Sequence, residues 1–288
     1  MTKKWRRKKN LSEICSEALR RELEALELNR DVGNLVSSFR SHTSIEETIA
    51  ARYKLTDVEI VDASGETGDL REKLGKIAAD FLNRYLSDGS ILGISGGRQM
   101  WCVVKNLTRR NVKVTISALG IRQDDPRILH AHANTLAGIL WLLYSPRSEA
   151  LVIGNDPTEV NSIWANKLPV ETSAKYFVIG SCAPFNSESY LVPLLGKKAA
   201  SDLLNHGACG DFLYQFFGED GEIISTPNLA QQSILSSDLL RELSRRPDSK
   251  VILVAGGREK LKSLRFALEG GLCNVLVTDQ ETARGLLN

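Results

Sequence analysis

The stretch from residue 91 to residue 107 constrains the fold of this chain most, because its hydrophobic period changes at a glycine pair. Residues 91–95 are mostly apolar and typical of a short buried strand. Gly96 and Gly97 break that pattern, and the apolar residues of 98–107 recur at helical spacing. We therefore predict a strand, a glycine turn and a helix in direct succession.

The chemistry of this turn leaves two interpretations open. A glycine turn that enters a helix leaves backbone N–H groups unpaired at the positive end of the helix dipole, which favours an anion such as phosphate. Arg98 and Gln99 stand where the helix begins, and both side chains can donate hydrogen bonds to oxygen. Ordinary strand–helix turns also contain glycines, which there serve only tight packing.

The same alternation of strand and helix continues along the chain. Strands are expected at 58–61, 112–117, 150–153, 176–181, 251–255 and 274–278, and helices at 70–86, 132–144, 197–205, 258–268 and 279–287. A turn is expected at 207–211, then an apolar run at 212–217 and a hairpin-like turn at Asp220–Gly221. This pattern predicts an α/β fold with a doubly wound, Rossmann-like, mostly parallel sheet.

The charge distribution, the apolar runs and the cysteines indicate which classes of protein this chain does not belong to. The net charge is +2, and six basic residues fall within the first ten positions. No apolar run reaches the length of a bilayer and no signal peptide is recognisable, so we expect a cytoplasmic protein without membrane contact. The five cysteines are scattered, so neither disulfides nor a zinc site is expected. His130 and His132 lack accompanying carboxylates at ligand spacing, and we expect no metal and no cofactor.

Residues 1–43 are expected to form a basic tail and a helical extension in front of a domain at 44–288. An apolar stripe from Leu11 to Leu26 predicts association into a dimer or tetramer, since exposed stripes of this kind usually pair. If Gly33 is taken as the turn of a DNA-binding helix-turn-helix, Asn29 stands where a small residue is needed. The match is poor, and any DNA contact would come from the basic tail or from a partner.

Four pieces of the chain occur in an order and spacing that resemble a known family. They are Gly93–Arg98, His132–Thr135, Gly207–Gly221, and Val254–Lys260 together with Gly270–Asp279. Taken together they resemble the sugar-binding (effector) domain of SorC/DeoR-like bacterial transcription regulators over most of the predicted domain. The resemblance departs from the family at the N-terminus, where no helix-turn-helix is recognisable, and at Leu119–Arg122.

The resemblance implies a sheet like that of the sugar-phosphate isomerases and CoA transferases, with a phosphorylated sugar bound at the carboxyl ends of the strands. It also implies a set of ligand-binding residues, which are Ser95, Gly96, Gly97, Arg98, Gln99, Ser181, Asp211 and Lys260. The first five would hold the phosphate, and Asp211 and Lys260 would line the sugar end. Without the resemblance, Asp211 is equally well explained as a cap of the segment that follows it. Lys260 could be a solvated helix residue, but a cation in the first turn of a helix opposes the helix dipole and an anionic ligand would offset this, which favours a ligand role.

We therefore expect a sugar-phosphate-sensing transcription regulator, or a stand-alone effector-binding protein of the same type, that does not turn over its ligand. The alternative is a sugar-phosphate isomerase or deaminase of the same fold, which would need a general base near the first two sugar carbons. Asp211 together with Lys260 is the pair that would have to supply proton transfer in that case. The identity of the sugar does not follow from the sequence.

Overall fold

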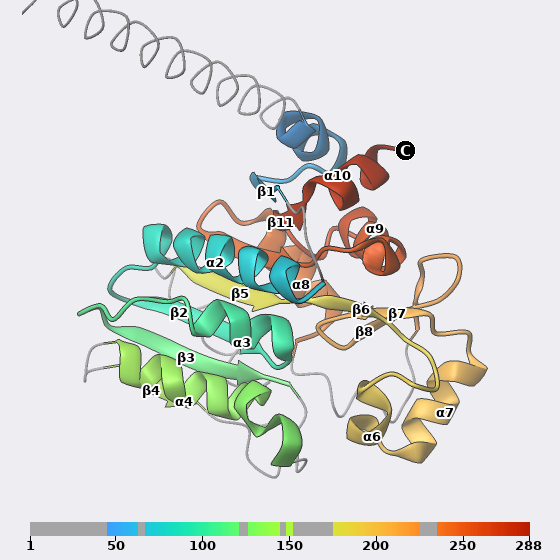
Figure 1. The fold of residues 1–288 in the computed structure, drawn as a ribbon, viewed down its shortest axis with the longest axis horizontal. Helices are drawn as coiled ribbons and strands as arrows, with labels where there is room; N and C mark the ends of the chain where they lie inside the picture. The colour runs from blue at the N-terminus through green and yellow to red at the C-terminus, as the bar shows by residue number, and fades with distance from the viewer. Residues whose placement is uncertain (1–44, 63–66, 121–125, 145–147, 152–174, 225–234) are drawn as a thin grey trace, which may run out of the picture. The chain divides into compact units, whose positions relative to one another are not determined.

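The computed structural model describes residues 45–62, 67–120, 126–144, 148–151, 175–224 and 235–288. Residues from Glu46 to Asn288 form one compact unit (Figure 1). The basic tail and helical extension expected at 1–43 lie outside the described residues. The division of the chain into 1–43 and 44–288 therefore stays a prediction.

A seven-stranded sheet lies at the centre of this unit. Its strands are β1 (Asp57–Val61), β2 (Ser90–Ser95), β3 (Val114–Leu119), β4 (Glu149–Leu151), β5 (Tyr176–Gly180), β10 (Ser249–Val254) and β11 (Val275–Asp279). Their spatial order is β1-β11-β10-β5-β2-β3-β4, and every neighbouring pair is parallel. The predicted α/β fold is confirmed, and all seven of these strands are parallel.

The inner strands are hydrophobic runs because the sheet is covered on both faces. Every residue of β2, β5 and β11 is buried, as is usual for parallel sheets between two helical layers. Parallel neighbours also need a crossover helix between them, and the predicted strand–helix–strand unit is formed by β2, α3 (Arg98–Val104) and β3.

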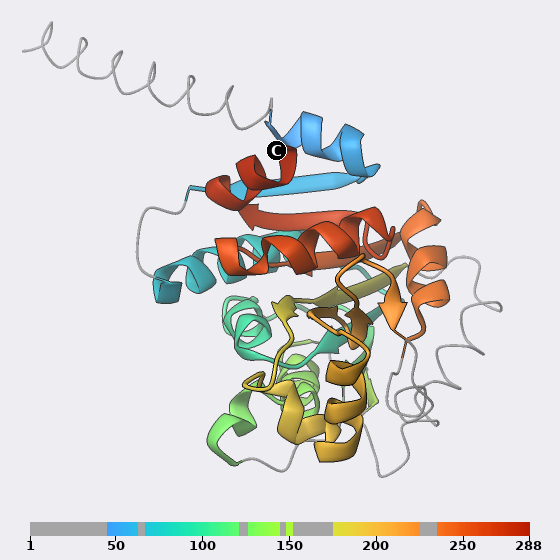
Figure 2. The same cartoon turned by 90° about the vertical axis from the view of Figure 1, so that its right-hand side faces the viewer.

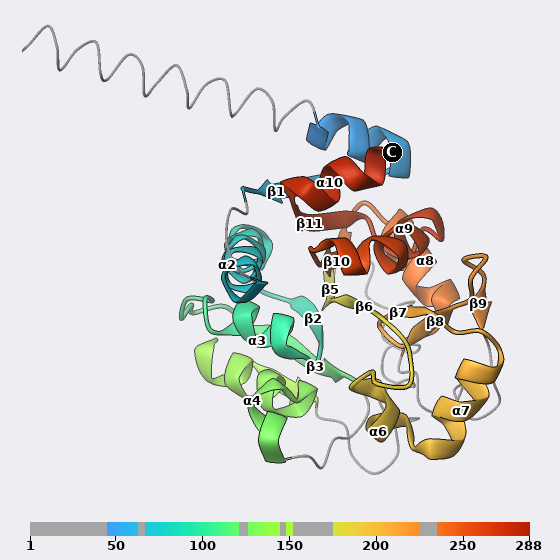
Figure 3. The ribbon, with the colours of Figure 1, turned by 45° about the vertical axis from the view of Figure 1, so that its right-hand side comes forward.

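The helices divide between the two faces according to the direction in which the chain crosses the sheet. The chain runs from β2 to β3 in one direction and from β10 to β11 in the other. Right-handed crossovers therefore put the connecting helices on opposite faces. Figure 3 shows α2 (Thr67–Tyr85), α3 and α4 (Ala133–Leu143) on one face, with α8 (Ser237–Arg245) and α9 (Leu261–Glu269) on the other.

The close approach of α2 to α3 depends on Gly75. A Cβ atom added at this position would lie 2.5 Å from the backbone carbonyl oxygen of Cys102, which belongs to α3. Any larger residue would therefore force the two helices apart. Because α3 begins at Arg98, this contact also sets the position of the turn that was expected to bind an anion.

A second, antiparallel sheet follows β5 in the chain. Its strands, in spatial order, are β6 (Cys182–Pro184), β7 (Gly210–Phe212), β8 (Gln215–Phe217) and β9 (Ile223–Ile224). The helices α6 (Leu191–Leu195) and α7 (Lys197–Asn205) pack on it through a cluster that includes Phe185, Leu191, Leu203 and Phe216. Figure 2 shows these elements, in yellow to orange, grouped together beside the main sheet.

The sequence predictions fail mainly in this second sheet. The segment 207–211, expected as a turn, ends inside β7, and the apolar run 212–217 folds back on itself at Leu213 and Tyr214. These two residues have φ values of 51° and 63°, as in a two-residue hairpin turn of type I′. Strands of two or three residues are too short for a hydrophobic period to reveal them. The turn expected at Asp220–Gly221 does separate β8 from β9.

The two ends of the described unit meet at α10 (Gln280–Leu287). The first described helix, at 45–53, donates two hydrogen bonds to the last turn of α10. The Tyr53 hydroxyl donates to the Leu286 carbonyl at 2.9 Å, and the Arg52 guanidinium donates to the Leu287 carbonyl at 2.8 Å. These bonds satisfy carbonyl groups that a helix end leaves unpaired.

Candidate functional site

The topology of the main sheet creates a crevice between β2 and β5. From β2 the chain continues outward to β3 and β4, whereas β5, β10 and β11 extend the sheet in the opposite direction. Open α/β sheets bind ligands at such a switch point, outside the carboxyl ends of the strands. Gly96 follows β2, Ser181 follows β5 and Gly256 borders the end of β10, so these three strand ends meet at one place.

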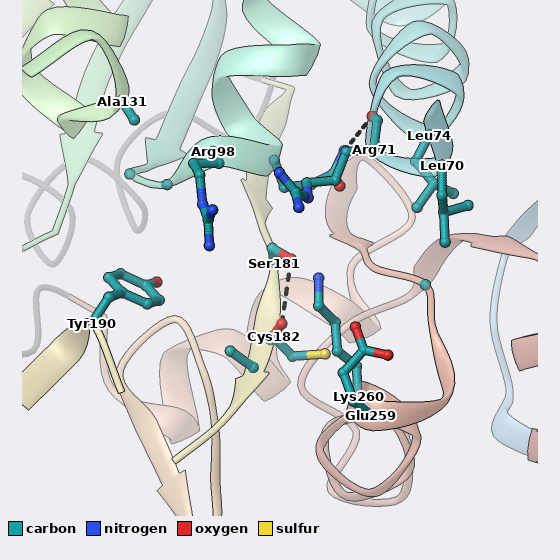
Figure 4. A pocket seen from close by; sticks show the side chains of 15 residues that line it. Leu70, Arg71, Leu74, Arg98, Ala131, Ser181, Cys182, Tyr190, Glu259 and Lys260 are labelled. Carbon is teal, nitrogen blue, oxygen red and sulfur yellow. Dashed lines mark hydrogen bonds between the residues drawn. The ribbon is translucent and has the colours of Figure 1, made fainter. Parts of the chain in front are cut away.

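A pocket of about 340 Å³ lies at these strand ends. Its wall is formed by the glycine turn after β2 (Gly96 and Gly97), by the glycine turn after β10 (Gly256 and Gly257), by the first turns of α2, and by the start of the second sheet (Figure 4). The lining residues are Leu70, Arg71, Leu74, Gly96, Gly97, Arg98, Gln99, Ala131, Ser181, Cys182, Ala183, Tyr190, Gly256, Glu259 and Lys260.

The fold brings together most of the residues singled out from the sequence. Gly96, Gly97, Arg98, Gln99, Ser181 and Lys260 all line the pocket. The other two, Ser95 and Asp211, are buried, with 6% and 4% of their surface exposed, and are not among the lining residues. Whether any of the eight contacts a ligand remains a prediction.

Glycines at the two turns adopt a backbone conformation that other residues rarely reach. Gly97 precedes α3 with φ at 116°, and Gly257 precedes the 3₁₀ turn η2 (Arg258–Lys260) with φ at 102°. Glycine adopts positive φ without steric cost, which explains its presence at both positions. The helix expected from Arg258 to Leu268 therefore begins as this tighter turn and continues as α9.

The backbone of the first turn is only partly free for a ligand. The Gly97 N–H donates to the Ala131 carbonyl at 2.8 Å, so it is occupied within the protein. Ala131 ends the 3₁₀ helix η1 (Pro126–Ala131). At the start of α3, no side chain caps the helix, and N–H groups of a first helical turn have no partner inside the helix.

Positive charge dominates the pocket. Arg71, Arg98 and Lys260 line it together with one carboxylate, that of Glu259. In the described part of the chain, none of the three cations has a carboxylate within ion-pairing distance. Figure 4 shows Arg98 and Lys260 pointing into the pocket from opposite sides. Unpaired cations converging on one cavity repel each other, and an anionic ligand would relieve this repulsion.

Asp211 lies buried in β7, beside the pocket. Its carboxylate accepts hydrogen bonds from the backbone N–H groups of Tyr214 and Ala183, while Oδ1 has no partner. Burial raises the pKa of Asp211 to about 7, against the opposing effect of those N–H groups and of the Lys260 charge. At neutral pH the carboxyl group is therefore present in both protonation states.

Arg71 and Tyr190 are among the lining residues that the sequence did not predict. Arg71 belongs to α2, where other exposed positions are also charged, so no pattern distinguishes it. Tyr190 immediately precedes α6, a five-residue helix that contains a proline and has no recognisable period. Although 46% of the Tyr190 surface is exposed, desolvation of the phenol raises the pKa of Tyr190, and the nearby Asp211 carboxylate raises it further. Its phenol is therefore neutral at physiological pH and can donate a hydrogen bond.

The two histidines take separate structural positions. The His130 ring packs edge-on against Trp101, with ring centroids 5.4 Å apart, whereas His132 is buried and stands at the N-cap position of α4. Within the described residues, no group of three or more His, Cys, Asp or Glu side chains is arranged to hold a metal ion. Among the same residues, no helix combines the length and apolar character that a membrane crossing requires.

Fold and pocket together define an α/β ligand-binding domain, and comparison with known proteins identifies its family. A family model described as "Putative sugar-binding domain" matches residues 37–146 and 169–288. The Deoxyribonucleoside regulator of Bacillus subtilis (strain 168) is 26% identical over 272 residues, which covers 88% of this chain and 82% of the relative. The Sorbitol operon regulator of Klebsiella pneumoniae is 24% identical over 257 residues, covering 84% and 79%.

Solved structures agree on the fold. A probable sor operon regulator from Shigella flexneri superposes with a TM-score of 0.66 at 20% identity, covering 85% of this chain and 99% of the other. The full-length sorbitol operon regulator SorC from Klebsiella pneumoniae gives a TM-score of 0.66 at 22% identity, covering 87% and 82%. The chain belongs to the sugar-binding domain family of SorC/DeoR transcription regulators. These relatives are regulators rather than enzymes, in agreement with the sequence prediction.

Proposed function

We propose that this protein is a cytoplasmic transcription regulator whose pocket binds a phosphorylated sugar as an effector and does not turn it over. The observation that carries the proposal is that Arg71, Arg98 and Lys260 converge on one pocket and that, among the described residues, no carboxylate forms an ion pair with any of the three. A phosphate monoester is close to a dianion at neutral pH. The net positive charge of the pocket therefore favours such a group over a neutral sugar.

The pocket also offers groups suited to the sugar. The phenol of Tyr190 can donate or accept a hydrogen bond, and the hydroxyl of Ser181, which donates to the Cys182 carbonyl at 3.4 Å, can accept one. Leu70 and Leu74 add an apolar wall. We place the phosphate at Arg98 and the start of α3, and the sugar toward Lys260. Binding sites for small molecules commonly combine an apolar wall with a few polar groups of this kind.

An enzyme of the same fold is less well supported. A general base must reach the proton that it removes, and Asp211, the base suggested by the sequence, lies outside the pocket lining. The relatives named above are regulators.

The proposal also includes two kinds of partner. The protein contacts DNA through residues 1–43 or through a partner, and it associates into a dimer or tetramer. Light scattering across micromolar protein concentrations tests the association, and a mass of one chain throughout would contradict it.

Ligand titration tests the proposed effector. Phosphorylated sugars should raise the melting temperature, because a ligand that binds only the folded state stabilises it by mass action, and the same sugars without phosphate should have little effect. Arg98→Ala should weaken binding by roughly 1.5–3 kcal/mol, the range for a lost charge-assisted hydrogen bond. Arg109→Ala is the matched control, since Arg109 is exposed and does not line the pocket. Unchanged affinity in Arg98→Ala for every phosphorylated sugar would refute the phosphate assignment.

A further inference from the structure

The phenol of Tyr190 lies beside the glycine turn that follows β2. A Cβ atom added at Gly97 would stand 3.9 Å from the hydroxyl oxygen of Tyr190, which is an ordinary van der Waals distance. Figure 4 shows the Arg98 side chain extending toward the side of the pocket on which Tyr190 lies. The hydroxyl is therefore close to the end of the pocket at which we place the phosphate.

This hydroxyl has no hydrogen-bond partner among the residues that the structure describes. The side chain of Tyr190 lines the pocket and 46% of the residue surface is exposed, so a ligand can reach it. The pKa of Tyr190 is raised by desolvation and by Asp211, whereas the Arg98 guanidinium opposes this rise and so lies near enough to act on the phenol. Tyr190 therefore offers a neutral, free donor next to a positive charge.

A phosphoryl oxygen suits this donor better than a sugar hydroxyl does. The Arg98 guanidinium has only donors, and a phosphate dianion has only acceptors, so the two attract each other. A phosphoryl oxygen drawn to Arg98 is then also beside the Tyr190 hydroxyl, which can donate to it. A hydrogen bond to a charged acceptor is roughly twice as strong as one between neutral groups. The phenol could meet either end of the ligand, and its position favours the phosphate.

The segment that carries Tyr190, residues 186–196, is attached to the second sheet and not to the glycine turn. Leu191 of α6 is buried in the apolar cluster on that sheet, and its N–H donates to the Ser189 hydroxyl at 3.3 Å. Among the described residues, no hydrogen bond joins the segment 186–196 to residues 96–98. A phosphate that binds to both sides would supply a polar link between them.

We propose that Tyr190 is a ligand-binding residue that donates a hydrogen bond to a phosphoryl oxygen held by Arg98, and that the bound phosphate thereby fastens the segment 186–196 to the turn after β2. The inference rests on the proposed function, since it concerns the same pocket and states how the ligand changes the protein. A ligand shifts a protein between two states only by binding one of them more tightly. Here the phosphate binds the fastened state more tightly, and a sugar without phosphate cannot make the link.

Isothermal titration of the full chain tests the hydrogen bond. Ribose 5-phosphate, glucose 6-phosphate and fructose 6-phosphate are titrated into the wild-type protein and into Tyr190→Phe, which keeps the ring and removes the hydroxyl. Every sugar phosphate that binds the wild type should lose roughly tenfold in affinity, because each presents the same phosphate group. The matched control is Tyr85→Phe, a change at an exposed tyrosine outside the pocket lining, which should leave all affinities unchanged.

A structural role for the Tyr190 hydroxyl makes a different prediction. Because the hydroxyl has no partner among the described residues, Tyr190→Phe should melt at the wild-type temperature in the absence of ligand. A lowered melting temperature together with weaker binding would show a structural role and overturn the inference. A loss of affinity confined to one of the three sugars would show contact with a sugar hydroxyl, and unchanged affinity for all of them would show no contact. Either result would also overturn the inference.

Amide hydrogen exchange tests the fastening of the segment. With the tightest of the three sugar phosphates at saturation, the backbone amides of 186–196 should exchange more slowly than without ligand. In Tyr190→Phe at the same saturation, this slowing should be lost. Equal exchange with and without ligand in the wild type would overturn the fastening while leaving sugar-phosphate binding in place. Absence of binding by any phosphorylated sugar to the wild-type protein would overturn the proposed function and this inference together.

Discussion

Replacement of Gly75 by alanine is expected to destabilise the domain, although alanine is the better helix former. The added Cβ would lie 2.5 Å from the Cys102 carbonyl oxygen, 2.6 Å from its carbon and 2.7 Å from its Cβ. Two of these atoms belong to the backbone of α3, so α2 and α3 must separate to restore ordinary contact distances. Overpacking of this kind costs up to about 3 kcal/mol, and the helix propensity of alanine returns about 1 kcal/mol.

The expected net loss therefore reaches about 2 kcal/mol at most, which for a domain of this size lowers the melting temperature by up to roughly 8 °C. Gly138→Ala is the matched control, because Gly138 lies in the middle of α4 with no atom within 4 Å of an added Cβ. That change should stabilise by roughly 0.5–1 kcal/mol. Differential scanning calorimetry of both variants decides the matter. Equal or greater stability of Gly75→Ala relative to Gly138→Ala would refute the packing argument.

Separation of α2 from α3 should also weaken ligand binding. The hydrogen bond from Gln99 to Arg71 spans the same two helices, and Arg98 is carried by α3. Gly75→Ala is therefore expected to lose affinity for a phosphorylated sugar even below its melting temperature. Unaltered affinity in Gly75→Ala would show that the pocket tolerates a shift between these helices.

Three further predictions follow from single residues and from the N-terminal segment. The pKa of Asp211 is raised from 3.8 to about 7 in the folded protein, so the contribution of its proton to stability is complete below pH 4 and is lost as pH rises through 7. Over this range the free energy of unfolding should fall by at most about 4 kcal/mol. Asp211→Asn should remove this fall from unfolding curves measured in urea at several pH values. Asp279→Ala should cost about 1–2 kcal/mol in the same assay, since its carboxylate caps α10 and accepts from the Gly257 N–H, and it should also weaken ligand binding. Deletion of residues 2–10 should abolish weak, salt-sensitive DNA binding in a mobility-shift assay without affecting sugar-phosphate binding; tight, salt-tolerant binding to one DNA sequence would contradict an electrostatic tail.

The main sheet could be predicted from sequence because its signals are long and local. The change of period at Gly96 placed β2 and α3, and α7 runs from Lys197 to Asn205, the range expected from its pattern. A similar pattern was available for α8, where Ser236 caps the helix and Leu240 and Leu243 are its buried residues, yet the helix was not predicted. By contrast, α6 contains a proline and β6 ends at one, so neither follows a propensity rule.

The sequence predicted many of the residues at the candidate site, but it did not predict what each side chain contacts there. Family motifs singled out Arg98 and Lys260, which do line the pocket, but nothing in the sequence indicates that Arg71 joins them. The state of the Gln99 amide depends on the backbone carbonyl of a residue 28 positions away. The burial of Asp211 likewise depends on how the second sheet packs. Roles of this kind are set by contacts between distant segments, which no local pattern encodes.

The helix α10 has a mechanical consequence, because its two ends are fastened to different parts of the domain. At its beginning, the Asp279 carboxylate holds the loop of Gly256 and Gly257, which borders the pocket. At its end, the carbonyls of Leu286 and Leu287 receive hydrogen bonds from the helix at 45–53. Eight helical residues span about 12 Å, so one short helix connects the loop that borders the pocket to the helix at 45–53. A truncation that removes Leu286 and Leu287 would therefore also remove the acceptors of the Tyr53 and Arg52 hydrogen bonds, at the end of the helix whose beginning holds the pocket loop.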